Sequence, residues 1–406
     1  MTAVADPPIT RPGRVIGVDV ARGVALFGMM ATHVYDAFRV DGTPMTSTVL
    51  ASGRSAATFA LVAGVSVAFL TGGRNAVQGT EHTAAAMGLT VRALLIGAVG
   101  LLLGFAGSGI SLILPYYAVM FLLAIPLLRL RPRTLALLSA MSVLLAPVLL
   151  LVTTQLGLDY TGRPNPTLVT VFSDPGALLV QLFLTGSYPV VAYMAYLCAG
   201  MAIGRLDLRS RRVAERLLVG GIALAVISKA VSYVLLYPLG GLDRLIVQNG
   251  PSGGAADAAT FLLWDPQQGS SWWYLALASP HANTQLDVAH TLGSAMAVLG
   301  AALLVTRVAA VRDLTWPVAA AGAMTLTLYS AHVLVLESEV LETDLLELGL
   351  TVQYIVLVAA SLVFAVVWRR RHDQGPLEKM VAVVASRARD AVLSRSATPV
   401  GAPERE

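Results

Sequence analysis

Apolar residues run along the chain in stretches of about 20, separated by short polar segments that often contain glycine or proline. Helices of this length cross the hydrocarbon core of a bilayer, whereas membrane β-strands alternate apolar and polar positions over about ten residues. The pattern predicts about ten helical spans, at 15–37, 55–71, 90–108, 110–128, 134–153, 180–204, 214–237, 286–306, 315–337 and 350–368. The expected fold is therefore all-α, a polytopic transmembrane helical bundle.

Composition supports this prediction. Hydrophobic residues make up 56% of the 406 residues and charged residues only 13%, about half the charged fraction that is usual in soluble domains. A polar, proline-bearing stretch precedes the first apolar run, which has no small-residue cleavage site, so this run is expected to stay as a span. Cys198 is the only cysteine, which excludes an intrachain disulfide and a cysteine-based metal site.

Arginines predict the orientation of the bundle. One set of alternate segments is rich in arginine and includes Arg11, Arg14, Arg74, Arg92 and the clusters at 129–133, 205–216, 307–312 and 369–371. The other set has only Arg39, Arg54, Arg163 and Arg244. Because short loops rich in Lys and Arg stay in the cytoplasm, both termini are predicted to be cytoplasmic, with the connections 154–179 and 238–285 outside. The pI near 9.3 then reflects topology, and no nucleic-acid partner is expected.

The chain divides into a cytoplasmic N-terminal tail at 1–13, a transmembrane domain at 14–368 and a basic cytoplasmic tail at 369–406. No internal repeat and no separate soluble domain is evident from the sequence. The tail is expected to form a surface helix at "PLEKMVAVVASRARDAVL", and residues 176–186 could form a short interfacial helix. The expected location is the cell (plasma) membrane, which the chain crosses many times.

Three groups that lipid penalises share one face of the first span. Asp19, Arg22 and His33 are separated by 3 and 11 residues, and these offsets return to nearly the same angle on a helix. Asp19 and Arg22 can pair near the cytoplasmic end, where they either bind substrate at a cytoplasmic mouth or lock the helix against a neighbour. His33 lies about 21 Å further along, and an ionisable group inside an apolar run favours a functional role.

Four of the six histidines gather at the predicted outer side, at His33, His281, His290 and His332. Arg54 opens the second span at the same level. An imidazole can take and return a proton near neutral pH, and an arginine beside it can stabilise a developing oxyanion. His33, His281 and Arg54 are therefore the candidate catalytic residues.

Further polar groups at this depth are candidate substrate-binding residues: Tyr188, Thr284, Tyr329 and His332. Each has an ordinary alternative, because tyrosines commonly anchor spans at the interface and loop histidines commonly face water. Asp287 and His290 could instead pair or cap their helix, and Lys229 is either a snorkelling cation or an anion ligand. No histidine pair has the spacing of a helical metal motif, so no metal is expected.

Five blocks of the sequence follow one another in a familiar order. They are "RVIGVDVARGVALFGMMATHV", "SGRSAATFALVAGVSVAFLTGG", "SPHANTQLDVAHTLGSAMAVLGAALL", "GAMTLTLYSAHVLVL" and "GPLEKM". From about Arg14 to Met380, the chain thus resembles the YeiB-like bacterial membrane proteins, which are related to the heparan-alpha-glucosaminide N-acetyltransferase family. The resemblance implies a transmembrane acyltransferase that moves an acyl group, typically from acetyl-CoA, to a sugar or lipid-linked glycan on the far side.

The resemblance also bears on site positions. The polar residue of the family's first helix, an asparagine in the animal enzymes, falls at His33. The catalytic histidine of the animal enzymes lies in the loop after that helix, but the corresponding "DAFRVDGTPMTSTVLASG" contains no histidine. Either His33 or His281 would then take this role.

The leading hypothesis is acyl transfer. His33 would deprotonate an acceptor hydroxyl or amine, Arg54 and His281 would stabilise the oxyanion, and an acyl-CoA phosphate would meet Arg22. The expected partners are acyl-CoA, an extracytoplasmic glycan or lipid-linked acceptor and membrane lipid. The oligomeric state stays open, with a homodimer among the options.

Two other functions remain in view. One is a proton-coupled transporter or exporter of a small anionic metabolite, although the sequence reveals neither an inverted repeat nor matching broken spans. The other is a non-catalytic membrane partner whose sequence blocks only pack helices together. Acyl transfer predicts binding of a CoA thioester, and transport predicts flux coupled to pH.

Overall fold

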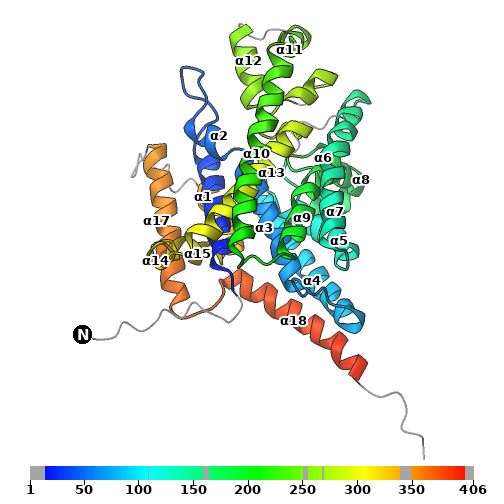
Figure 1. Ribbon diagram of the computed structural model, residues 1–406, viewed down its shortest axis with the longest axis vertical. Coiled ribbons are helices and arrows are strands. Elements are labelled where there is room, and N and C mark those ends of the chain that lie inside the picture. Colours follow the sequence, from blue (N-terminus) through cyan, green and yellow to red (C-terminus); the bar gives the residue numbers. More distant parts are fainter. Residues whose placement is uncertain are drawn as a thin grey trace, which may run out of the picture.

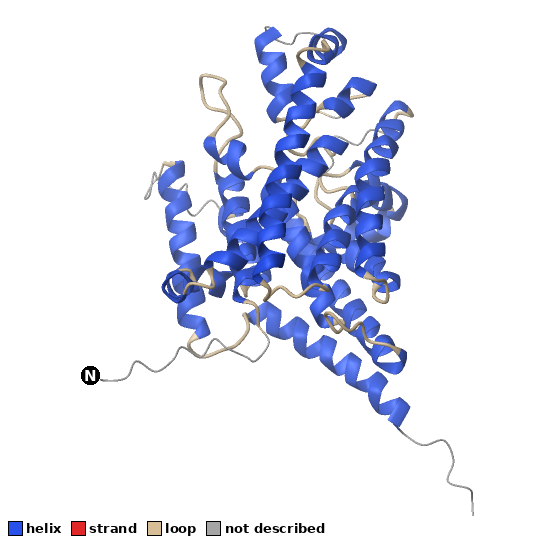
Figure 2. Cartoon of the chain, viewed as in Figure 1, coloured by secondary structure: helices blue, strands red, loops and turns tan. Residues whose placement is uncertain are grey.

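The computed structural model describes residues 14–107, 109–158, 164–249, 255–267, 269–338 and 349–397. Within these ranges the chain consists of helices and loops, with no β-strand (Figures 1 and 2). An isolated antiparallel bridge joins Phe38 to Pro44. The predicted all-α class is confirmed.

The longer helices are α1 (Ile16–Val34), α3 (Arg54–Leu70), α4 (Gly79–Leu103), α6 (Pro132–Gln155), α9 (Val190–Gly204), α10 (Arg211–Leu236), α13 (Gln285–Val305), α17 (Leu350–Arg369) and α18 (Pro376–Ala397). The shorter helices are α2 (Thr46–Ala51), α5 (Leu114–Ala124), α7 (Leu168–Ser173), α8 (Pro175–Val180), α11 (Gly241–Asn249), α12 (Ala255–Trp264), α14 (Ala309–Leu314), α15 (Trp316–Gly322) and α16 (Thr325–Glu337). Single turns of 3₁₀- or π-helix are η1 (Gly104–Ala106), η2 (Ile125–Leu127), η3 (Gln181–Thr185) and η4 (Trp272–Ala276).

Among the described residues, six helices are long and apolar enough to cross a membrane, and two bent pairs raise this number to eight. The bent pairs are Pro175–Thr185 with Val190–Gly204, at 57°, and Trp316–Gly322 with Thr325–Glu337, at 83°. The other two predicted spans correspond to α1, which carries several polar groups, and to the short apolar helix Leu114–Leu127. All ten predicted segments are thus helical, while the count of ten spans and the cytoplasmic termini stay predictions.

The helix α3 is the most buried of the six long spans and packs against α1, α9 and α13. Small residues permit these close crossings. Where α3 meets α9, a Cβ added at Gly200 would lie 3.0 Å from the Cα of Gly64 and would overlap the backbone of Leu61. The crossing of α10 and α13 is also tight, because a Cβ at Gly293 would lie 2.6 Å from the carbonyl oxygen of Gly221.

The substitution Gly200→Val is therefore expected to destabilise the bundle by about 3 kcal/mol, the upper end for overpacking, because backbone rather than a flexible side chain blocks the new atoms. Thermal unfolding in detergent, followed by tryptophan fluorescence, measures the effect. The matched control is Gly220→Val, a helical glycine with nothing within 4 Å of the added Cβ. Equal melting temperatures for the two variants would contradict the close α3–α9 crossing.

The tail helix α18 crosses below the bundle and packs along α4 (Figure 1). Its first turn brings Glu378 to the broken end of α16, where one carboxylate oxygen accepts the N–H groups of Leu326 and Thr327 at 2.6 and 3.1 Å. The other oxygen accepts the Thr327 hydroxyl at 2.6 Å. A carboxylate at a helix N-terminus satisfies otherwise unpaired N–H groups, so Glu378 fixes where α16 begins. The surface helix predicted in the tail is α18.

Candidate active site

Two cavities approach the middle of the bundle from opposite ends. The first, which we name the charged cavity, has a volume of about 380 Å³ and lies among the start of α1, the end of α3 and the start of α18. The second, the histidine cavity, has a volume of about 440 Å³ and lies among the end of α1, the joint before α3 and the end of α16. Both cavities therefore reach α1, at opposite ends of this helix, and the histidine cavity also reaches Ser52, just before α3.

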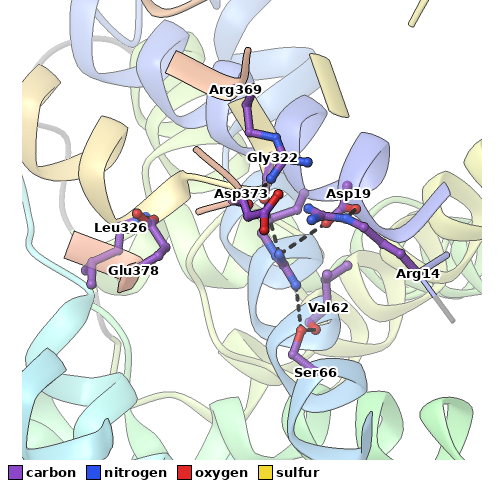
Figure 3. A network of polar contacts seen from close by, with 10 residues as sticks. Arg14, Asp19, Val62, Ser66, Gly322, Leu326, Arg369, Asp373 and Glu378 are labelled. Atoms are coloured by element: carbon purple, nitrogen blue, oxygen red, sulfur yellow. Dashed lines mark hydrogen bonds and ion pairs between the residues drawn. The ribbon is translucent and has the colours of Figure 1, made fainter. Parts of the chain in front are cut away.

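The charged cavity contains a network centred on the Asp19–Arg22 pair (Figure 3). Asp19 is buried, and its Oδ2 accepts a hydrogen bond from Nε of Arg14 at 2.6 Å. Its Oδ1 lies 3.6 Å from Nη1 of Arg22. Arg22 also donates to the carbonyl oxygen of Gly322 at 3.2 Å and to the Ser66 hydroxyl at 2.5 Å. The pair predicted from sequence is present, and it ties α1 to α3 and to the bend between α15 and α16.

Two groups in the charged cavity are left for a ligand. Arg92 of α4 lines it and, in the described part of the chain, makes no hydrogen bond or ion pair. Tyr117 of α5 is only 2% exposed, and its hydroxyl has no hydrogen-bond partner among the described residues. A buried hydroxyl without a hydrogen bond destabilises the folded protein, so a ligand that bonds to it would be favoured. The carboxylates of Asp19 and Glu378, in contrast, already have partners in the protein. Among the described residues, the cavity thus offers a half-buried cation and a buried hydroxyl to a ligand.

The histidine cavity collects side chains from segments far apart in the sequence. It is lined by Thr32, His33, Val34, Ser52, Gly109, Ile110, Ser111, Tyr188, His281, Leu336, Glu337 and Gln353. Sequence depth alone placed His33, His281 and Tyr188 at one level, and the structure brings all three to one cavity.

His33 belongs to a pair of imidazoles. Its Nδ1 lies 2.9 Å from Nε2 of His332, and the two rings are stacked with centroids 5.2 Å apart. The Nδ1 of His332 lies 3.3 Å from the carbonyl oxygen of Leu328, so in the neutral ring this nitrogen carries the proton. His332 Nε2 then accepts from His33 Nδ1–H, and the tautomers assigned from these partners leave His33 Nε2 with a free lone pair.

Tyr329 connects this pair to the charged cavity. Its ring lies edge-on to His332 with centroids 5.0 Å apart, and it lines the charged cavity from the other side. Its hydroxyl accepts the N–H of Ile113 at 3.4 Å. The predicted binding residues Tyr329 and His332 are buried between the two cavities, and they touch each other.

His281 lies in the loop before α13, in the left-handed region with φ of 60°. Non-glycine residues adopt this conformation rarely, so the surroundings must hold it. Asn283, with φ of 52°, donates from its side chain to the carbonyl oxygen of His281 at 3.0 Å, and its own N–H is accepted by Asp287 at 3.0 Å. The N–H of Gly53 donates to Nε2 of His281 at 3.2 Å. A neutral His281 therefore carries its proton on Nδ1 and acts as a hydrogen-bond donor.

The ionisation of His281 follows from its surroundings. The ring lines two cavities, but the protein packed around it lowers its pKa below the ordinary value, and the carboxylate of Asp265 acts in the opposite direction. The ring is consequently neutral at pH 7.

Arg54 and Thr284 do not line the histidine cavity. Arg54 donates to the carbonyl oxygen of Val49 at 2.7 Å and to Nε2 of His290 at 3.2 Å, while His290 Nδ1–H donates to the carbonyl oxygen of Ala225 at 3.0 Å. Thr284 caps α13 by accepting the N–H of Asp287 at 3.1 Å, and it donates to the carbonyl oxygen of Leu277. Their geometry favours a supporting role, because these contacts hold the loop and the helix joint that carry His281 and Gly53.

A third cavity, of about 360 Å³, adjoins the histidine cavity and shares Ser111, Tyr188 and His281 with it. We name it the polar cavity. Its other polar lining residues are Tyr116, Asn165, Gln181, Thr185, Ser187, Asp265, Gln267, Tyr274 and Asn283. Hydroxyls, amides and one carboxylate beside aromatic rings suit a polar, uncharged or amine-bearing ligand.

Sequence reasoning missed several lining residues. Arg92 was interpreted only as a topological charge, and Glu378 only as part of a surface helix. Glu337 begins an acidic stretch, "ESEVLETDLLE", that gave no sign of a cavity. Gln353 is the only amide side chain in an apolar run, which is the sequence feature that could have pointed to it. In the described residues, no group of three His, Cys, Asp or Glu side chains could hold a metal ion.

Comparisons with known proteins agree with this architecture. Residues 14–232 match a family model described as "Heparan-alpha-glucosaminide N-acetyltransferase, catalytic". Residues 251–387 match a second model, described as "Protein of unknown function (DUF418)", which corresponds to YeiB-like proteins. No curated protein matches the chain. With a match over more than half of its length, the chain belongs to the heparan-alpha-glucosaminide N-acetyltransferase catalytic family, as a YeiB-like multi-pass membrane protein.

Proposed function

We propose that this protein is a membrane acyltransferase that moves an acyl group from a CoA thioester in the charged cavity to an acceptor in the histidine cavity. The observation that carries the proposal is the set Tyr329, His332 and His33, which lies between two cavities that enter from opposite ends. A donor from one side and an acceptor from the other can meet only at such a place.

The charged cavity fits the donor. A CoA phosphate would pair with Arg92, which makes no hydrogen bond or ion pair among the described residues, and Arg22 would keep its structural bonds. The pantetheine arm would pass the unpaired hydroxyl of Tyr117 and point its thioester toward Tyr329. Arginine suits this role because its planar donors match phosphate oxygens.

The chemistry needs a base and an oxyanion donor, and the two histidines divide these roles. His33 Nε2 takes the proton of the acceptor O–H or N–H while the acceptor oxygen or nitrogen attacks the thioester carbonyl carbon. The resulting oxyanion receives a hydrogen bond from Nδ1–H of His281. Collapse restores the carbonyl and breaks the C–S bond, and the departing thiolate takes the proton from His33 to give free CoA. Arg54, assigned to the oxyanion from sequence alone, acts here as a positioning residue.

The acceptor side is the histidine cavity together with the adjoining polar cavity. Following the arginine distribution, this end is extracytoplasmic and the charged cavity opens to the cytoplasm. The related enzyme's name points to a glucosaminide, and the polar cavity lined by Asn165, Gln181 and Asp265 suits a sugar or a lipid-linked glycan. An amino sugar and a neutral sugar are the probes with which to begin.

Binding of acetyl-CoA to the purified protein tests the donor site. Calorimetry is expected to show binding in the wild type and about tenfold weaker binding in Arg92→Ala, since a charge-assisted hydrogen bond contributes about 1.5–3 kcal/mol. Arg74→Ala is the matched control, because Arg74 follows α3 near the same end and its side chain is 68% exposed. Absence of binding to folded wild-type protein would overturn the CoA-dependent function.

Proton-coupled transport of a small anion is the second candidate, and one observation favours it. The bends of 57° and 83° are broken helices of the kind that line transporter sites, although sequence reasoning found no such pair. Flux of a small anion into proteoliposomes under a pH gradient, without acyl-CoA, would support transport over transfer.

A further inference from the structure

A groove on the outward face of α10 is not used by the proposed chemistry. It has a volume of about 550 Å³ and is lined by Ala225, Val226, Lys229, Ala230, Ser232, Tyr233, Leu236, Tyr237, Leu263, Ala278, Ser279 and His290. Its lining is mostly apolar, and Val226, Tyr233 and Tyr237 are exposed. On a helix apolar enough to cross a membrane, such a face meets lipid.

Lys229 is the exception in this apolar lining. Its Nζ donates to the carbonyl oxygen of Ala278 at 2.5 Å and lies 6.0 Å from the ring centre of Trp264. Within the described ranges no carboxylate is close enough to form an ion pair with it. An ammonium has three donors, so the bond to Ala278 leaves others available. A cation beside lipid is expensive unless an anion compensates it.

The position of Lys229 along α10 suits a lipid headgroup. Its amine reaches the loop that carries Ala278 and His281, at the end of the bundle opposite α18. Tyr233 and Tyr237 follow one and two turns later, with ring centres 4.8 Å apart, and tyrosines favour the membrane interface. In the other direction Val226, Ile222 and Val219 are exposed and apolar. A headgroup beside Lys229 would thus have its acyl chains along this apolar side of α10.

The charges behind the groove favour an anion. His290 lines the groove and accepts a hydrogen bond from Arg54. The guanidinium of Arg54 is therefore a second cation, separated from the groove by the His290 side chain. Asp287 is the only carboxylate of α13, and its charge acts on both Lys229 and Arg54, so one negative charge faces two cations here. We propose that this groove binds an anionic phospholipid of the adjacent leaflet, with its phosphate on Nζ of Lys229.

The chain contains only two lysines, Lys229 and Lys379, which makes the test specific. Native mass spectrometry of the full chain with phosphatidylglycerol or phosphatidylcholine measures lipid retention. Wild type should retain phosphatidylglycerol about fivefold better, the effect of about 1 kcal/mol from one basic residue. Lys229→Met should lose this preference, and Lys379→Met, on α18 at the far end, should keep it. Equal retention of both lipids by wild type, or an unchanged preference in Lys229→Met, would overturn the proposal.

A second measurement avoids reliance on a variant that could fail to fold. In nanodiscs, an amine-reactive reagent should modify Lys229 more slowly with phosphatidylglycerol than with phosphatidylcholine, with Lys379 as internal reference. An unchanged ratio of the two lysines would count against the site. Stronger protection by a polyprenyl phosphate than by phosphatidylglycerol would overturn the assignment to a phospholipid.

Discussion

The substitution His33→Ala is expected to slow acyl transfer by about 10²–10⁴-fold, the usual contribution of a positioned general base. In the His33–His332 pair, Nε2 of His33 is the nitrogen left with a free lone pair, and His33 lines the histidine cavity, so this atom is the one available to an acceptor there. Release of free CoA thiol from acetyl-CoA, with the amino sugar and neutral sugar as acceptors, measures the rate. Binding of acetyl-CoA should be unchanged, because the donor occupies the other cavity.

The matched control for this prediction is His82→Ala. His82 lies at the start of α4 and lines neither cavity, so its loss should leave the rate near that of the wild type. If His33→Ala released CoA as fast as His82→Ala, His33 would not be the base.

The substitution His281→Ala is expected to lower the rate by about 10²–10³-fold, the cost of removing one oxyanion donor. Gly53 holds Nε2 of His281, so Nδ1–H is the atom that faces the reaction. The same residue predicts a pH dependence. Protonation would add an N–H at Nε2 against the N–H of Gly53, which breaks the bond that positions the ring. Because the protein lowers the pKa of His281, this happens only as the pH falls below the ordinary histidine value of 6.5.

A wild-type rate of thiol release that decreases as the pH is lowered below 6.5 would agree with this role. The folded state then binds fewer protons than the unfolded state, so stability from this group is also lost as the pH falls. His281→Gln keeps an N–H donor and should recover part of the rate without the part of the pH dependence that comes from His281, while the dependence due to the base His33 stays. Full activity in His281→Ala would exclude the residue from the site.

The depth of each polar side chain along its span was predictable from sequence, but the neighbour that the side chain faces was not. Counting residues along apolar runs placed His33, His281 and Tyr188 at one level, and the structure brings them to one cavity. Arg54 was assigned the same level, but its donors face Val49 and His290. Helical periodicity defines a face, whereas the neighbour that the face meets depends on packing between helices far apart in sequence.

The missed residues have a related cause. Arg92 was explained by topology, since an arginine near a span end satisfies the distribution of positive charge whether or not it lines a cavity. The bend between α15 and α16 was hidden because its residues are apolar on both sides. The carboxylate that stabilises it belongs to Glu378, which lies 51 residues after its partner Thr327. Such long-range pairing leaves no local pattern in the sequence.

The central claim, that donor and acceptor meet between the two cavities, is tested most directly by a photoreactive acyl-CoA with its reactive group in the acyl chain. Crosslinking to the purified full chain, followed by peptide mapping, is predicted to label peptides that contain Tyr117, Tyr329 or His332, and excess acetyl-CoA should suppress the labelling. Labelling confined to other parts of the chain, or labelling that acetyl-CoA does not suppress, would contradict the claim.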